Sequence, residues 1–422
     1  MELPFANSCN IVGDSIPFIR NEETNKYKPD EYTQIKYIKL NFHFMMKSDS
    51  TLNFRPYDDG LGNCAFTAYD YSNEIIRLMN QRLSYNEPMH LPQGNNTQAL
   101  PRKYRVVLKG VYFHYDDNAY TFSDTSPGHL SFSEIQNYSV NADNEVNVFF
   151  VYEDCPNGND GGNANMTGNR YIRKKKSWQK YVGYGNLGFW ADAFVLTHEL
   201  GHNLGLKHTM HTNNGYCCNT CDDGFTDTPT RIEIINSGQP DPCPSFGDED
   251  IYHSNNMMDY SGLLALTPEQ LGMVHYTLTH DMFSYLEDDF CTVNQNEPEI
   301  VLEAGQDLTW QNDRIMKNNL IIESGAKLIL KDCILHVPSG ANIIVKPGGQ
   351  LIVDGATITN RCGLMWQGIE VWGNKNAHQY KDGNGQYAQG YVELKNGATI
   401  ENAVCALALW RPNHWSTTGG NR

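Results

Sequence analysis

The sequence predicts an α+β domain followed by an all-β domain of the right-handed parallel β-helix type. Two observations predict this division. Before about residue 290, apolar residues recur at both helical and strand spacings, whereas after it short apolar strands alternate with Gly-Ala or Gly-Gly turns. The chain has 422 residues, 40% of them hydrophobic, which is enough for more than one core. We therefore assign residues 34–288 to the first domain, 289–302 to a linker and 303–422 to the second domain, after an N-terminal segment of residues 1–33.

Strands and helices alternate in the first domain. Apolar patterns predict strands over residues 37–45, 105–113 and 146–152. Between the first two, residues 73–83 place their apolar side chains on one stripe behind Ser72, which predicts an amphipathic helix with Ser72 as its N-cap. The stretch Thr267-Pro-Glu-Gln270 is a capping box with proline at the first helical position, and it predicts the start of the last helix of the domain.

The second domain contains internal repeats. Residues 323–330 and 346–353 are similar to each other, and residues 396–402 repeat residues 354–360 almost letter for letter. A repeat of about 23 residues predicts a solenoid, in which each coil buries one face against the next. Strands rich in Ile, Val and Leu with glycine at the corners favour a parallel β-helix, and a β-sandwich with similar turns is the alternative. Because no polar capping repeat precedes Arg422, we expect the natural protein to extend beyond it.

The charge balance narrows the functional class. Lys and Arg number 32 against 49 Asp and Glu, a formal net charge of −17. A chain this acidic binds nucleic acid or an anionic membrane poorly, because like charges repel. No apolar run approaches the roughly 18 residues that a membrane span needs. The first residues show no signal-peptide pattern, which leaves open that one was removed.

Eleven cysteines bear on the compartment in which the protein folds. Four of them lie close together, at Cys217, Cys218, Cys221 and Cys243. The Cys-Cys-x-x-Cys pattern is compatible with a zinc knuckle or with a disulfide knot. Because no second Cys-x-x-Cys pair is present, disulfides are favoured, and with them an oxidising compartment. The odd number means that one thiol is free, intermolecular or paired with a cysteine outside this chain.

The most informative motif runs from His198 to His208. In His198-Glu-Leu-Gly-His202, two histidines at positions i and i+4 lie on one face of a helix, where both imidazoles reach one metal ion. Gly205 permits the chain to turn so that His208 returns as a third ligand. We expect these histidines to bind one catalytic Zn²⁺, with Glu199 as the general base that activates a zinc-bound water. Isolated helical histidines on a surface are the alternative, which the additional matches at Gly205 and His208 argue against.

At this point the chain resembles the metzincin metallopeptidases. The stretch Asn256-Met-Met-Asp-Tyr260 is similar to their Met-turn. The resemblance implies that Met258 lies beneath the metal and that Tyr260 stabilises the oxyanion. Residues 221–229 and 243–246 narrow the resemblance to the pappalysin-like branch. It implies a mixed twisted sheet with an active-site helix over residues 34–288. The second domain also resembles the β-helix repeats appended to secreted bacterial proteins.

Several residues have an open interpretation within this resemblance. The oxygen ligands of Asp222, Asp223, Asp227 and Thr228, with Thr226 beside them, form either a calcium site or solvated turns. In the N-terminal segment, which would be a pro-segment remnant, Cys9 is either an inhibitory zinc ligand or part of a disulfide.

The chain also departs from the pappalysin-like pattern. Residues 261–266 contain neither the acidic residues of relatives that prefer basic substrates nor the usual cysteine, so no basic specificity is carried over. The basic run at residues 173–176 is expected at a solvated strand or loop edge, with a place near the substrate cleft as the alternative.

The sequence therefore favours a secreted zinc endopeptidase that cleaves extended polypeptides, which would pair with an edge strand above the cleft. Its expected location is extracellular, including a bacterial cell surface, where the β-helix would target a surface or matrix component. The alternative is a non-catalytic adhesin in which the β-helix binds glycans or protein partners and the metal domain is incidental. The absence of cleavage of any peptide would favour that alternative.

Overall fold

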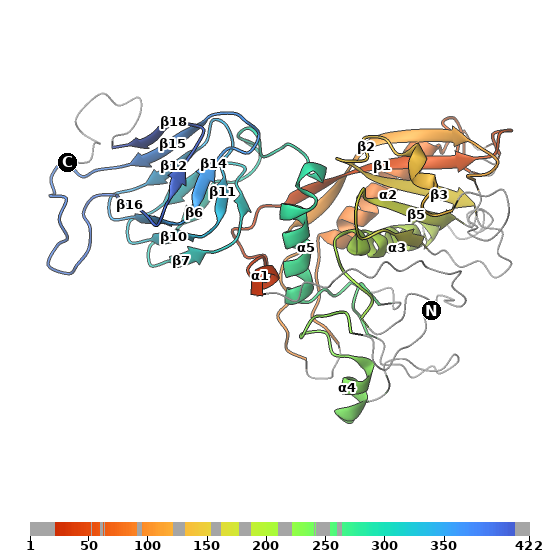
Figure 1. Cartoon of the computed structure of the whole chain (residues 1–422), viewed down its shortest axis with the longest axis horizontal. Helices are drawn as coiled ribbons and strands as arrows, with labels where there is room; N and C mark the ends of the chain where they lie inside the picture. The colour runs from red at the N-terminus through yellow and green to blue at the C-terminus, as the bar shows by residue number, and fades with distance from the viewer. Residues whose placement is uncertain are drawn as a thin grey trace. The chain divides into compact units, whose positions relative to one another are not determined.

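The computed structural model divides the chain into two compact units (Figure 1). Unit 1 comprises Met1–Glu31 and Ile35–Glu287, and unit 2 comprises Tyr32–Gln34 and Asp288–Arg422. None of the helices described is long and apolar enough to cross a membrane. The structure describes residues 22–51, 53–59, 62, 64–90, 95–120, 131–152, 162–176, 187–209, 222–239, 241, 254–259 and 264–409.

Unit 1 contains a five-stranded sheet with the strand order β2-β1-β3-β5-β4. Its strands are β1 (Lys36–Met46), β2 (Tyr104–Tyr115), β3 (Val146–Tyr152), β4 (Gly162–Ala164) and β5 (Tyr171–Lys176). The three strands predicted from the sequence are β1, β2 and β3, and they pair in parallel. β5 continues the parallel set, whereas the short β4 is antiparallel to it and forms one edge of the sheet. The predicted mixed sheet is therefore present.

Helices cover the sheet of unit 1 (Figure 1). α2 packs against β2, α3 against β4 and β5, and the two helices contact each other. α1 packs on α5. The helices described in unit 1 are α1 (Glu22–Asn25), α2 (Ala68–Leu83), η1 (Ile135–Tyr138), α3 (Leu187–Asn203), α4 (Arg231–Asn236), α5 (Pro268–His280) and η3 (Phe283–Tyr285).

The ends of these helices test two sequence predictions. α5 begins with the predicted capping box, in which Thr267 accepts a hydrogen bond from the Gln270 amide. The N-cap predicted for α2 was wrong, because the helix begins one turn earlier, at Thr67. Thr67 and Asp70 form a reciprocal capping box, and Ser72 lies inside the helix, where its hydroxyl donates to the Ala68 carbonyl. Together, the Thr67 and Asp70 side chains accept hydrogen bonds from two backbone amides at the start of the helix, whereas Ser72 alone would accept from one.

The basic run at residues 173–176 corrects another prediction. Lys174 is fully buried, and its Nζ lies 3.0 Å from Oδ1 of Asp192 on α3. The Tyr71 hydroxyl donates to the other oxygen of the same carboxylate at 2.7 Å. Arg173 is buried too, with its guanidinium over the Phe132 ring. A solvated edge is therefore wrong for these two residues, because β5 has a neighbouring strand on each side and α3 on one face.

Unit 2 consists of three parallel sheets with the orders β16-β13-β10-β7, β17-β14-β11-β8 and β18-β15-β12-β9-β6. Lys327 of β10 pairs with Gln350 of β13, which is the predicted spacing of about 23 residues. Every pairing between these strands is parallel, whereas a β-sandwich is antiparallel. The arrangement is consistent with a β-helix-like domain. The strands are β6 (Ile300–Leu302), β7 (Asp307–Trp310), β8 (Arg314–Ile315), β9 (Leu320–Ile322), β10 (Lys327–Lys331), β11 (Ile334–His336), β12 (Asn342–Val345), β13 (Gln350–Asp354), β14 (Thr357–Thr359), β15 (Trp366–Val371), β16 (Tyr391–Lys395), β17 (Thr399–Ile400) and β18 (Ala403–Ala408).

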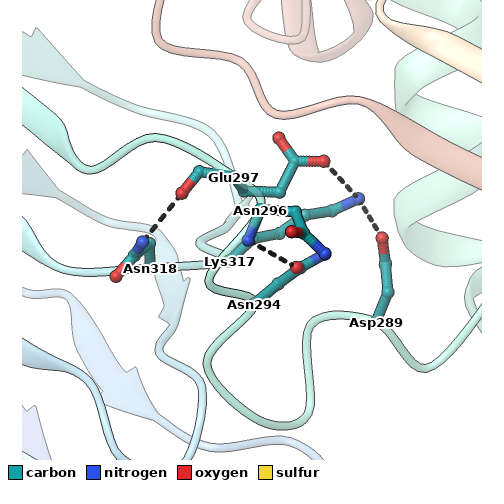
Figure 2. A network of polar contacts seen from close by, with 6 residues as sticks. All are labelled: Asp289, Asn294, Asn296, Glu297, Lys317 and Asn318. Carbon is teal, nitrogen blue, oxygen red and sulfur yellow. Dashed lines mark hydrogen bonds and ion pairs between the residues drawn. The ribbon is translucent and has the colours of Figure 1, made fainter.

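Residues 289–302, assigned to a linker from the sequence, are held within unit 2. A disulfide joins Cys291 to Cys362. The buried Lys317 ammonium forms an ion pair with Asp289 and lies 3.9 Å from a carboxylate oxygen of Glu297 (Figure 2). The Asn318 side chain donates to the Glu297 carbonyl at 2.7 Å (Figure 2). These contacts and the pairing of β6 with β9 connect the segment to the sheets.

Most of the cysteines considered in the sequence lie outside the described residues, namely Cys9, Cys155, Cys217, Cys218, Cys221 and Cys243. Of the cysteines that the structure describes, Cys64, Cys333 and Cys405 are free thiols. The pairing within the 217–243 cluster therefore stays a prediction.

Candidate active site

Three imidazoles meet at the end of α3. His198 and His202 lie one turn apart on the helix, which ends at Asn203. Gly205 follows with φ of 90°, a left-handed conformation that glycine adopts without strain, and the chain turns back there. This turn brings Nε2 of His208 to 3.1 Å from Nε2 of His198 and 3.1 Å from Nε2 of His202.

The hydrogen bonds of the Nδ1 atoms determine where the Nε2 lone pairs of His198 and His202 point. Nδ1 of His198 lies 2.8 Å from the Met257 carbonyl oxygen, and Nδ1 of His202 lies 2.8 Å from that of Leu206. A carbonyl only accepts, so each Nδ1 carries the proton, and each Nε2 presents a lone pair to the common centre. Burial, and then the neighbouring His198, lowers the pKa of His202 to about 3, which keeps this ring neutral.

The spacing of the nitrogens fits a zinc ion. Ligands at the usual zinc–nitrogen distance of about 2.0–2.1 Å in a tetrahedron lie about 3.3 Å from one another, close to the observed separation. Within the described part of the chain, these three histidines are the one group of at least three His, Cys, Asp or Glu side chains whose ligand atoms converge. The donor set therefore suits Zn²⁺ with one coordination position left open.

Glu199 lies beside the histidines and against the edge strand of the sheet. Its side chain is buried, and a Cβ added to Gly162 of β4 would lie 2.8 Å from Glu199 Cγ and 2.9 Å from Oε1. A larger residue at this point of β4 would displace the Glu199 carboxylate. Gly162 thus belongs to the site, although the sequence analysis did not identify it, because a glycine in a Gly- and Asn-rich stretch is usually a turn residue.

The methionine of the predicted Met-turn reaches the same helix. A Cβ added to Gly201 would lie 2.4 Å from Sδ of the buried Met258, so the helix has glycine where the methionine packs. Asn256 shapes this turn, since its Oδ1 accepts from the Met258 amide at 2.9 Å and its Nδ2 donates to Gln270 at 2.7 Å. The capping box of α5 is thereby connected to the turn whose Met257 carbonyl holds His198. Tyr260 lies outside the described residues.

The predicted calcium ligands form a separate group. The Thr228 hydroxyl donates to Asp223 Oδ1 at 2.6 Å, and the Glu269 amide donates to Asp227 Oδ2 at 2.9 Å. Asp222 lies close enough to Asp223 to raise its pKa. In the region described, Asp222, Asp223 and Asp227 are not among the groups of three or more His, Cys, Asp or Glu side chains whose ligand atoms converge. The acidic side chains are therefore near one another without forming a complete cage.

One family model matches part of the chain. Residues 64–227 match the family model Reprolysin_5, described as Metallo-peptidase family M12. The matched stretch contains four strands of the sheet in unit 1 and the whole histidine motif. The part of the chain that carries the histidine motif is therefore similar to a metallopeptidase domain.

Three solved structures are similar to this chain. One is mirolysin in complex with compound 9, at 15% identity and TM-score 0.38, covering 61% of this chain and 97% of that one. A second is mature mirolysin of Tannerella forsythia with a cleaved peptide, at 17% identity and TM-score 0.36, covering 58% and 92%. The third is metalloproteinase-II from Bacteroides fragilis, at 13% identity and TM-score 0.23, covering 51% and 59%. No curated protein matches the chain.

Proposed function

We propose that this protein is a secreted zinc-dependent endopeptidase of the metzincin, pappalysin-like type that cleaves extended polypeptides. The observation that carries the proposal is the convergence of three imidazole Nε2 atoms. The buried Glu199 directly follows His198 on the same helix. His198, His202 and His208 would hold the zinc ion. When bound, zinc supplies the Lewis acidity that polarises a peptide carbonyl and acidifies water.

The remaining chemistry belongs to residues of this chain. Glu199 would accept the proton of the attacking water and deliver it to the leaving amine. The Met257 and Leu206 carbonyls keep two of the imidazoles in the tautomer that a metal ligand needs. Met258 would support the histidines from below, and Tyr260 would stabilise the oxyanion, as the metzincin resemblance implies.

The place of β4 supports the proposed class of substrate. This strand lies at the edge of the sheet, and its residue Gly162 touches Glu199. An extended peptide that adds to this edge is held by main-chain hydrogen bonds, next to the proposed base. Such binding depends on backbone length more than on side chains, which supports polypeptide substrates without assigning a side-chain preference.

Three finer parts of the proposal have their own support. The disulfide between Cys291 and Cys362 favours folding in an oxidising compartment, in line with secretion. The pappalysin-like assignment depends on the motifs at residues 221–229, 243–246 and 256–260. The parallel sheets of unit 2 support a β-helix that targets the enzyme to an extracellular surface.

Metal analysis combined with a peptide library tests the function. We expect about one zinc ion per chain, cleavage within extended peptides, and loss of cleavage on chelation with recovery on adding Zn²⁺. His208→Ala should lose both zinc and cleavage, whereas His378→Ala, which alters an exposed histidine of unit 2, should retain both. Cleavage that survives complete removal of metal would contradict the proposal, as would an unchanged zinc content in His208→Ala.

We also propose a calcium ion bound by Asp223 and Thr228 with Asp222 and Asp227. Asp223 is buried, and burial with two neighbouring carboxylates raises its pKa to about 7. Its Oδ2 accepts no hydrogen bond in the part of the chain described, and neither does Oδ1 of Asp227. A divalent cation would compensate this buried negative charge.

Thermal unfolding with and without calcium tests this second site. Zinc-loaded protein should unfold at a higher temperature with added Ca²⁺ than in calcium-free buffer with the same Zn²⁺, because calcium binds only the folded chain. Asp223→Asn should remove that dependence on calcium, and Asp49→Asn, which alters an exposed aspartate, should preserve it. Equal unfolding temperatures of the wild type in both conditions would refute the site.

A further inference from the structure

The last residue of the active-site helix joins it to the edge of the sheet. Asn203 directly follows His202 and is fully buried. Its side-chain amide donates to the Asn165 carbonyl at 2.5 Å and lies 3.4 Å from the Tyr171 carbonyl. Asn165 follows β4, and Tyr171 begins β5, so one side chain contacts both ends of the β4–β5 connection.

That connection is itself held by local bonds. The Asn165 side chain accepts from the Tyr171 amide at 2.8 Å and donates to the Thr167 carbonyl at 2.7 Å, which closes the turn. Across the two strands, Nε of Arg173 lies 3.4 Å from the side-chain oxygen of Asn163, and both residues are buried. The three-residue strand β4 is therefore bonded to the turn that Asn203 contacts.

Asn203 and Glu199 contact the same hairpin. They are four residues apart on α3, so their side chains lie on the same face of the helix. Glu199 touches Gly162 at the start of β4, and Asn203 holds the turn that follows β4. Contacts at both ends of the strand determine its distance from the helix. The position of the Glu199 carboxylate and the position of the strand edge that would receive the substrate therefore both depend on α3.

We propose that Asn203 is a positioning residue that sets the edge strand β4 relative to Glu199 and the histidines, and thereby aligns an extended polypeptide for cleavage. This inference rests on the proposed function. Its distinguishing consequence concerns substrate length. A long peptide that pairs with β4 depends on the strand's position, whereas a short peptide held mainly at the reacting bond does not.

Peptides of two lengths with the same scissile pair measure this effect. In the wild type, kcat/KM for a ten-residue peptide should clearly exceed that for a four-residue peptide. Asn203→Ala should reduce this ratio about tenfold, because a strand displaced by a fraction of an ångström misaligns the bound backbone. The same loss should appear without turnover: in the Glu199→Gln background, Asn203→Ala should weaken calorimetric binding of the ten-residue peptide by a similar factor.

Asn53 offers a matched control. It is buried in unit 1, and its side-chain amide also donates to two backbone carbonyls, those of Met45 and Phe150. Asn53→Ala should lower the unfolding temperature as Asn203→Ala does, yet keep the length ratio. If Asn203→Ala does not fold, Asn165→Ala, which opens the turn from its other side, should reproduce the reduced ratio.

The possible failures are distinguishable. An Asn203→Ala protein that folds and keeps the wild-type length ratio overturns the positioning role and leaves the peptidase proposal intact. A wild type that cleaves no peptide, with a Glu199→Gln variant that binds none, overturns the proposed function and this inference together. A loss of the ratio in Asn53→Ala equal to that in Asn203→Ala would show a general effect of destabilisation and would also overturn the positioning role.

Discussion

Glu199→Ala should lower kcat for peptide hydrolysis by about 10²–10⁴-fold while the protein keeps its zinc. Glu199 follows His198 on α3 but is not a member of the converging set, so its removal should spare the metal. The substitution should, however, remove the group proposed to accept the proton of the attacking water. Steady-state kinetics and metal analysis on the same preparation measure both effects.

Two further variants sharpen this test. Glu199→Gln keeps the size of the side chain but cannot accept the proton, and we expect the same loss as with alanine. Glu74→Ala removes a glutamate on the outer surface of α2 and should leave kcat unchanged. A Glu199→Gln protein with wild-type kcat would eliminate Glu199 as the base.

Asp192→Asn should destabilise unit 1 by about 3–5 kcal/mol, because it leaves the Lys174 ammonium buried without the carboxylate that lies 3.0 Å away. The expected fall in unfolding temperature is roughly 6–20 °C for a unit of this size. The variant also weakens the contact of Tyr71 with α3, since Tyr71 donates to the same carboxylate. Calorimetry or circular dichroism measures the loss.

Removing both charges should restore much of this stability. Lys174→Met combined with Asp192→Leu replaces the buried pair with apolar side chains of comparable volume, which is often neutral. Glu74→Gln, which breaks an exposed pair with Arg77, should have little effect. If Asp192→Asn unfolds at the wild-type temperature, the buried pair does not stabilise the domain.

The spacing of residues was enough to predict the centre of the candidate site. Histidines at i and i+4 share a helix face in any α-helix, so His198 and His202 had to lie together once the helix formed. A glycine at the helix end turns the chain within a few residues, which brings His208 back. The capping box at Thr267 is equally local. Such predictions succeed because each depends on neighbours within one or two helical turns.

Other features depend on contacts between distant segments. A run of four basic residues normally indicates a solvated edge, yet Lys174 is buried because α3 supplies Asp192 against it. Glycine fits at positions 162 and 201 because the Glu199 side chain lies close to the first and Met258 close to the second. No local sequence pattern reveals these contacts. A glycine inside a helix costs about 1 kcal/mol relative to alanine, so Gly201 was the one available signal of a close contact.

By itself, the sequence determined the fold class of unit 1, the histidine motif and the periodic strands of unit 2, because helical and strand periods and capping residues act over short distances. Only the tertiary structure decided which strand forms the edge beside Glu199, and that Asn203 holds it there. It also placed residues 289–302 against the sheets of unit 2. The physical reason is that burial and pairing depend on which segments meet in the folded chain, and that information is spread over the whole sequence.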